Sequence, residues 1–163
     1  ERRVRLSSRQ AAVNYCTRLL MGEKRELFYA ICLNGQMETL GDALIARGSL
    51  CDVPAYPRVV MDAALTHNAH GVLFCHSHPG GTIAPSQADL DATATLAHLL
   101  AEVEVAVVDH IIVCEGDALS MVRNGFISQQ ATQQGVVAHV ASSAGEARLA
   151  KGFKIDHQTT EEA

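Results

Sequence analysis

The stretch Gly71–Gly81, GVLFCHSHPGG, decides how the rest of this chain is interpreted. Its first five residues, Gly71–Cys75, are wholly apolar and short, which predicts an interior strand. Pro79 and the pair Gly80-Gly81 then require a loop. The sequence therefore predicts two histidines, His76 and His78, where a buried strand runs out into a loop.

Strands and helices are predicted on both sides of this segment from apolar periodicity, turn signals and capping residues. They are a helix from Ser7 or Ser8 to about Met21, a strand over Glu26–Leu33, a hairpin partner after Asn34-Gly35 through Leu40, a short extended piece in 44–51, a helix over Pro57–Asn68, a helix from Ser86 to about Leu100, a strand over Val103–Cys114 and a last strand over Leu119–Arg123.

Size and composition exclude several classes of protein. The chain has 163 residues, which suits one domain, and 48% apolar residues can fill one core. A charged content of 19% is too low for a disordered chain. The apolar runs are far shorter than the ~20 residues that cross a bilayer, so no membrane helix is expected. The chain begins at Glu1 rather than Met, as a fragment or processed product would.

Five scattered cysteines indicate neither a disulfide framework nor a thiolate zinc cage, because their number is odd and no CxxC pair occurs. A reducing, cytoplasmic location is expected.

Basic residues gather near the start of the chain. Residues 1–25 hold seven of them against Glu1 and Glu23, namely Arg2, Arg3, Arg5, Arg9, Arg18, Lys24 and Arg25. Such an arm could contact nucleic acid phosphates. A solvated helix face with a frayed terminus is the preferred interpretation, because a dedicated DNA-binding protein carries a broader basic footprint.

Beyond about Ser128 the composition shifts to Gln, Ala, Ser, Thr and Glu. We expect residues 1–127 to form the domain and residues 128–163 to be a flexible or partner-ordered tail with no stable element, except for a marginal helix over Ala144–Lys151.

His76 and His78 lie two positions apart, so at a strand end both side chains project from one face. The loop can return Asp89, in the first turn of the next helix, to the two imidazoles. Two imidazoles and one carboxylate form the three-ligand set of a catalytic zinc site with a fourth position for water. Ordinary loop histidines and a simple helix cap by Ser86 and Asp89 are the alternatives, and the combination favours the metal site.

A hydrolytic metal site also needs a carboxylate that moves protons without being a ligand. Glu26 lies at the start of an interior strand, where an acidic residue is costly unless it faces a cleft. A simple surface position at the strand entrance is its alternative role. Glu38, after the hairpin turn, is the second candidate.

Glu26, His76-Ser77-His78-Pro79, Ser86 and Asp89 together resemble the JAMM (MPN+) signature E…H-[ST]-H-P…S-x-x-D. The surrounding sequence resembles the RadC branch of that superfamily over roughly residues 5–127. The matching stretches are Arg25-Glu26-Leu27-Phe28, Arg47-Gly48-Ser49-Leu50, Tyr56-Pro57-Arg58, His67-Asn68-Ala69, the histidine loop and Asp109-His110-Ile111-Ile112-Val113.

This resemblance implies a single MPN/JAB-like domain of the α/β (α+β) class, with a curved mixed sheet flanked by helices. It implies Zn²⁺ held by His76, His78 and Asp89, Glu26 as general acid/base, and Ser86 as a donor to the oxyanion. JAMM enzymes cleave peptide or isopeptide bonds, so a protein or peptide substrate is expected, with a ubiquitin-like tail as one form of it.

Two departures from the RadC pattern are visible. Where those proteins usually read His-Asn-His-Pro-Ser-Gly, this chain has Ser77 and Gly80, neither of which is an expected ligand. The helix-hairpin-helix-like region that RadC proteins commonly carry upstream is absent from these residues, which weakens a DNA-binding role. The rival hypotheses are a non-catalytic interaction module on the same fold and a DNA-repair-associated protein.

Overall fold

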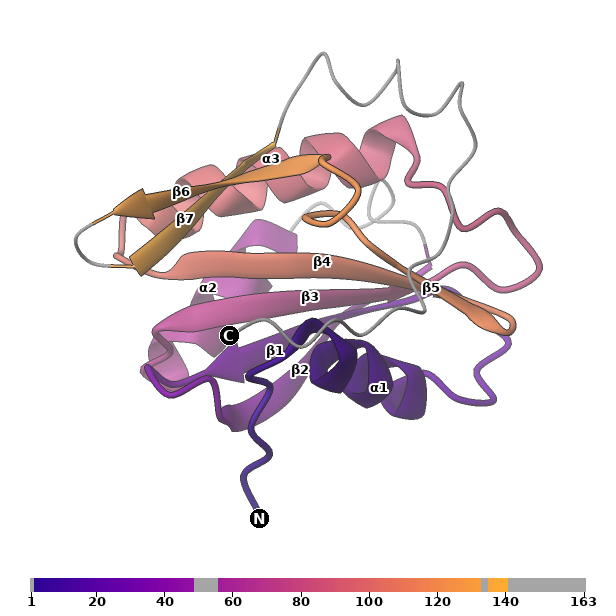
Figure 1. Cartoon of the computed structure of the whole chain (residues 1–163), viewed down its shortest axis with the longest axis horizontal. Coiled ribbons are helices and arrows are strands. Elements are labelled where there is room, and N and C mark those ends of the chain that lie inside the picture. Colours follow the sequence, from indigo (N-terminus) through magenta and orange to yellow (C-terminus); the bar gives the residue numbers. More distant parts are fainter. Residues whose placement is uncertain (1, 49–55, 133–134, 141–163) are drawn as a thin grey trace.

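The computed structural model describes residues 2–48, 56–132 and 135–140. For the residues after 127 it describes the backbone only. A five-stranded mixed sheet has the order β2-β1-β3-β4-β5, and a separate hairpin consists of β6 and β7 (Figure 1). The strands are β1 (Leu27–Leu33), β2 (Thr39–Arg47), β3 (Gly71–Ser77), β4 (Ala106–Cys114), β5 (Asp117–Ser120), β6 (Ile127–Thr132) and β7 (Gly135–Val140). The helices are α1 (Arg9–Leu19), α2 (Tyr56–Thr66) and α3 (Gln87–Ala101). This confirms the predicted α/β class.

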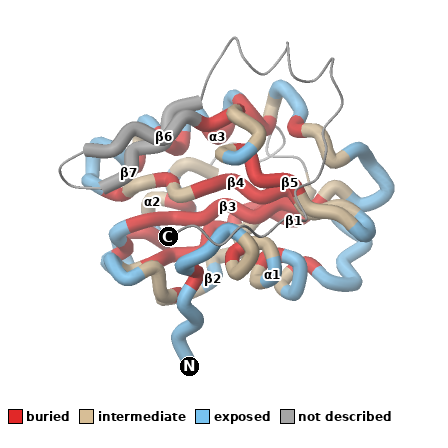
Figure 2. Tube along the Cα trace, viewed as in Figure 1, coloured by how far each residue is buried: buried red, intermediate tan, exposed pale blue. Residues whose placement is uncertain are grey.

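Helices cover both faces of the sheet. Alternate residues of β3 divide between two apolar clusters: Val72 and Phe74 pack with α2 and α3, whereas Leu73 and Cys75 pack with α1. Because both faces are covered, every residue of β3 is buried, as the predicted interior strand requires (Figure 2).

Pairing around β3 fixes which segments meet at its end. β1 runs antiparallel to β3 with Phe28 opposite His76, and β4 runs parallel to β3 after the crossover through α3. The start of β1 therefore lies beside the end of β3, and the first turn of α3 follows the loop that leaves this end. This brings Glu26, the histidine loop and Asp89 to one edge of the sheet.

The predicted elements correspond to observed ones, with three differences in the sheet. β4 begins at Ala106 rather than at Val103, because Glu104 takes a φ of 58° in the turn that follows α3. β2 is one continuous strand rather than two pieces, because irregularities in its pairing with β1 accommodate the extra residues. The last sheet strand, β5, spans 117–120 rather than 119–123, because Gly116 takes a φ of 76° that allows a tight return from β4.

The expectation of no stable element beyond about Ser128 is wrong for the described part of that segment. β6 and β7 pair antiparallel along their length, and β7 lies against α3 and β4. The β-branched pair Val136-Val137 favours a strand there. The helix predicted over Ala144–Lys151 lies outside the described residues, and the division into 1–127 and 128–163 stays a prediction.

Candidate metal centre

Four side chains from three elements meet at the edge of the sheet. Glu26 directly precedes β1, His76 lies on β3, His78 follows β3, and Asp89 lies in the first turn of α3. One potential ligand atom from each lies within 4.8 Å of all the others. The structure thus brings together the three residues predicted as ligands and the carboxylate predicted beside them.

Asp89 is held in place by the N-terminus of α3. The Ser86 hydroxyl accepts a hydrogen bond from the Asp89 amide at 3.1 Å, and Asp89 Oδ2 accepts one from the Ser86 amide at 2.8 Å. This reciprocal pair is a capping box. It provides hydrogen-bond acceptors for two backbone amides that have none within the helix. Ser86 and Asp89 therefore form the helix cap that was the alternative to a metal site. The cap uses Oδ2 of Asp89 and leaves Oδ1 facing His76.

His76 contacts both carboxylates. Its Nε2 lies 2.7 Å from Glu26 Oε1, and its Nδ1 lies 3.3 Å from Asp89 Oδ1. A carboxylate can only accept a hydrogen bond, so the shorter contact has the hydrogen on Nε2. The lone pair is then on Nδ1, which is buried and has no hydrogen-bond partner in the part of the chain that the structure describes.

A hydrogen bond from Nδ1 to the backbone orients the ring of His78. Nδ1 lies 2.9 Å from the Thr82 carbonyl oxygen, which can only accept, so Nδ1 carries the hydrogen. Nε2, the other ring nitrogen, lies 3.2 Å from Asp89 Oδ2 and is the atom that remains to bind a cation. A backbone carbonyl on the far nitrogen is the usual support of a metal-binding histidine, because it fixes the ring and its tautomer.

Burial and charge act in opposite directions on these groups. Burial lowers the pKa of His76, although Asp89 and Glu26 oppose it. Burial also acts against a charged His78, but the contacts with Asp89 and Thr82 outweigh it and raise the pKa of His78. For Asp89 burial is outweighed by His78, His76 and the Ser86 amide, which hold its pKa below the usual range. Asp89 is therefore an ionised carboxylate facing two imidazoles.

The donor set fits a divalent cation of the zinc class. Two imidazole nitrogens with carboxylate oxygens suit Zn²⁺, whereas Mg²⁺ and Ca²⁺ prefer oxygen ligands throughout. The unpartnered Nδ1 of His76 is the atom that such a cation would satisfy. The side chains of His76 and Asp89 are 1% and 6% exposed, whereas those of His78 and Glu26 are 15% and 34% exposed. The centre is therefore open on the side of Glu26 and His78.

Ser77 connects this centre to β1. Its side chain points away from those of the neighbouring histidines, donates to the Arg25 carbonyl at 3.1 Å and accepts from the Leu27 amide at 2.9 Å. The two bonded residues flank Glu26, so Ser77 fixes the backbone that carries this carboxylate. Strand alternation places Ser77 on the face opposite to His76, but the sequence alone assigns it no role.

The other predicted residues lie as follows. Glu38 ends the β1–β2 turn, where it bonds Asn34 at 3.0 Å and pairs with Arg5 at 3.8 Å, so it is not part of the cluster. Ser86 is exposed beside the centre and caps α3. A role for Ser86 at the oxyanion stays a prediction.

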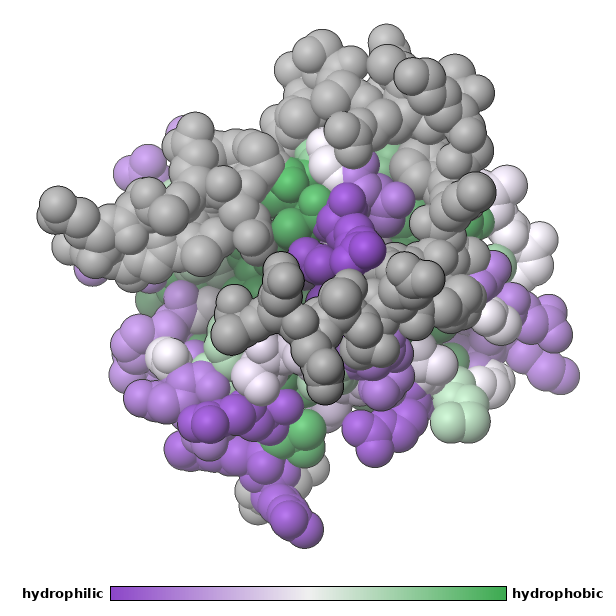
Figure 3. All heavy atoms as spheres, in the orientation of Figure 1, coloured by the Kyte–Doolittle hydropathy of each residue, from purple (hydrophilic) through white to green (hydrophobic). Residues whose placement is uncertain are grey.

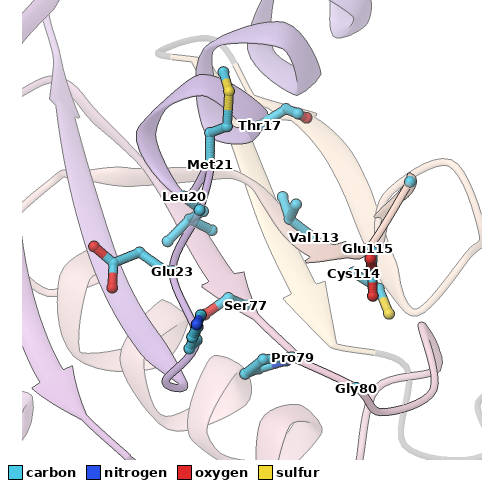
Figure 4. A pocket seen from close by; sticks show the side chains of 13 residues that line it. Thr17, Leu20, Met21, Glu23, Ser77, Pro79, Gly80, Val113, Cys114 and Glu115 are labelled. Carbon is cyan, nitrogen blue, oxygen red and sulfur yellow. The ribbon is translucent and has the colours of Figure 1, made fainter.

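A cleft of about 700 Å³ lies beside the histidine loop (Figure 4). The end of α1 and the β4–β5 turn form its walls, with Leu20, Met21 and Val113 as apolar lining. Ser77 at the end of β3 and Pro79 in the loop complete the lining. None of the four clustered residues lines it. The cleft thus adjoins the centre without containing it.

The fold and the cluster together define a JAB-like α/β domain with a candidate metal site. The family model described as RadC-like JAB domain matches residues 6–126, and the chain belongs to this family. Three bacterial relatives called UPF0758 protein are 39%, 38% and 37% identical to it, from Pseudomonas putida (strain W619), Pseudomonas fluorescens (strain SBW25) and Vibrio cholerae (strain M66-2).

The alignments cover 78%, 75% and 75% of this chain, and 56%, 54% and 54% of the three relatives. The chain therefore spans about half the length of the curated relatives that it matches. In the part of the chain that the structure describes, no helix is both long and apolar enough to cross a membrane.

Proposed function

We propose that this domain is a zinc-dependent metallohydrolase that cleaves amide bonds of the peptide or isopeptide type. The observation that carries the proposal is the convergence of Glu26, His76, His78 and Asp89 within 4.8 Å, on the edge of a sheet and open on one side. Membership of the RadC-like JAB family supports it.

His76, His78 and Asp89 are the proposed ligands, because their potential ligand atoms face one another in the least exposed part of the cluster. A bound Zn²⁺ would supply Lewis-acid polarisation of a carbonyl and a lower pKa for a water molecule. Asp89 brings a negative charge to this set, and the Thr82 carbonyl keeps the His78 ring in one orientation.

Glu26 is the proposed general acid/base. It is the most exposed member of the cluster, so substrate and water can reach it. Its carboxylate would accept a proton from the attacking water and deliver it to the nitrogen of the leaving amine. The hydrogen bond from His76 Nε2 holds Oε1 and leaves Oε2 as the atom for this transfer.

Ser86 is the proposed donor to the oxygen on which negative charge develops. Its oxygen already accepts from the Asp89 amide, so its hydrogen is the group that remains for a substrate. The first turn of α3 would thus supply both a ligand and an oxyanion donor.

The proposed substrate is a protein or peptide, including a ubiquitin-like tail. The adjoining cleft is lined by apolar side chains and also by Lys24 and Glu115, which suits a chain with both apolar and charged side chains. A cytoplasmic location is proposed with it, because the four cysteines that the structure describes are free.

The test is hydrolysis of amide-linked reporter peptides and isopeptide-linked conjugates by the zinc-loaded chain. Cleavage that disappears with a chelator, returns with Zn²⁺ and is absent in Glu26→Gln would support the proposal. A zinc-loaded chain that cleaves none of these substrates but binds a peptide equally well as Glu26→Gln would instead identify an interaction module.

A further inference from the structure

His110 lies next to the candidate centre but has no part in the proposed chemistry. It is completely buried on β4, with its ring centroid 5.8 Å from that of His76 and 5.4 Å from that of Phe28. Its Nδ1 lies 2.7 Å from Oγ1 of Thr93, which is also completely buried. A buried histidine therefore contacts α3 through one polar atom.

Thr93 lies one helical turn after Asp89, and its hydroxyl donates to the Asp89 backbone carbonyl at 2.6 Å. The backbone of Asp89 is thus hydrogen-bonded by a side chain on each side of its Cα. Ser86 engages the amide of Asp89, and Thr93 engages its carbonyl.

The direction of these hydrogen bonds follows from the number of hydrogens. A threonine hydroxyl has one hydrogen, and a carbonyl oxygen can only accept, so that hydrogen is directed at Asp89. The Thr93 oxygen must then accept from His110, whose Nδ1 carries a hydrogen. A directed chain of two bonds therefore runs from β4 through Thr93 to the backbone of Asp89.

We propose that His110 and Thr93 are positioning residues that hold the Asp89 carboxylate at the distance from His76 and His78 that metal binding requires. This inference rests on the proposed metal site. The pair connects α3, which supplies Asp89, to β4. Because β4 pairs directly with β3, which supplies His76, this connection fixes the position of Asp89 relative to His76. Support of this kind around a metal ligand typically changes metal affinity by about 10–100-fold.

The test compares Thr93→Val, which has nearly the same shape but no hydroxyl, with Thr93→Ser, which retains it. Thr95→Val is the matched control, because Thr95 is an exposed threonine on the same helix. Zn²⁺ affinity is measured by competition with a chromophoric chelator, and the visible absorption of Co²⁺ reports ligand geometry. Thermal unfolding in excess chelator reports the stability of the metal-free chain.

Thr93→Val is expected to bind Zn²⁺ about 10–100-fold more weakly and to alter the Co²⁺ spectrum. Thr93→Ser and Thr95→Val are expected to behave like the parent chain. His110→Asn, whose amide can donate from nearly the position of Nδ1, is expected to recover most of the affinity that His110→Phe loses.

A parent chain that binds no Zn²⁺ would overturn both the inference and the proposed function. Zinc binding by the parent chain with equal affinity and Co²⁺ spectrum in Thr93→Val and Thr95→Val would overturn the positioning role alone. If Thr93→Val does not fold, equal affinities of His110→Asn and His110→Phe would overturn that role.

Discussion

His76 Nε2 and Glu26 Oε1 lie 2.7 Å apart although 50 residues separate them in the chain. The antiparallel pairing of β1 with β3 creates this contact, because it places the start of one strand beside the end of the other. A proposed ligand and the proposed proton carrier thus touch directly, which makes it essential to separate their roles by experiment.

Glu26→Gln separates them, because glutamine can accept the same hydrogen bond from His76 but cannot carry the proton. We expect Zn²⁺ binding close to that of the parent chain and kcat lower by about 10²–10⁴-fold. His78→Ala is the comparison, and it should lose both metal and turnover. Metal content by elemental analysis and turnover on an amide substrate check this, and a Glu26→Gln chain with unchanged kcat would contradict the assignment.

Ser77→Ala removes the side chain that bonds both neighbours of Glu26. The Leu27 amide is then left without its partner in a buried setting, which costs about 1–3 kcal/mol of unfolding free energy. We expect lower turnover because Glu26 is less well held, with Zn²⁺ affinity little changed. Chemical denaturation and zinc titration measure the two effects. Ser7→Ala, at an exposed serine, is the control, and equal stability of the two variants would refute the role of Ser77.

Ser86→Gly distinguishes the helix cap from the oxyanion donor. Replacing serine by glycine at the N-cap lowers helix stability by roughly a few tenths of a kcal/mol. Glycine has no hydroxyl that could donate to a substrate. If Ser86 donates to the substrate oxygen, kcat should fall about 10²–10³-fold with nearly unchanged melting temperature. Unchanged kcat in a stable Ser86→Gly chain would restrict Ser86 to capping.

Asp109 predicts a dependence of stability on pH. Burial raises its pKa to about 6, although hydrogen bonds from Ser120, Val122 and the His110 amide oppose the shift. Between about pH 4 and pH 6 the unfolded carboxyl has released its proton while the folded one retains it. The contribution of the protonated Asp109 to folding stability is therefore complete below about pH 4, and it is lost as the pH rises through 6.

Asp109→Asn tests this, because the amide resembles the protonated carboxyl and does not titrate. Relative to the variant, the parent chain should lose up to about 1.4 kcal/mol of unfolding free energy per pH unit between pH 4 and 6. Denaturant titrations of both metal-free chains at pH 4, 5, 6 and 8 measure the difference. A parent chain whose advantage over Asp109→Asn grows with pH would contradict the raised pKa.

Local sequence signals predicted much of the architecture. The apolar run at Gly71–Cys75, the capping pair of Ser86 and Asp89 and the turn at Asn34-Gly35 each correspond to observed structure. The hairpin of β6 and β7 was missed, because a segment rich in Gln and Ala has weak strand propensity and β7 lies against α3 and β4, distant in sequence.

In the candidate site, too, contacts between elements distant in sequence could not be predicted from local signals. His76, His78 and Asp89 are close in sequence, so their spacing alone indicated a shared centre. Glu26 could be preferred over Glu38 through its strand position and the family resemblance, but strand pairing was needed to place it at His76. Thr93 had no signal beyond its place one turn after Asp89, since its partner His110 lies on another element.

The most direct test of the account is elemental analysis of the purified chain and its Asp89→Ala variant after equilibration with Zn²⁺ and removal of the excess. We predict about one zinc per parent chain and a large loss of zinc in the variant, because the carboxylate that faces both histidines is gone. Equal zinc content in the two proteins, or no zinc in either, would contradict the central claim that these side chains form one metal site.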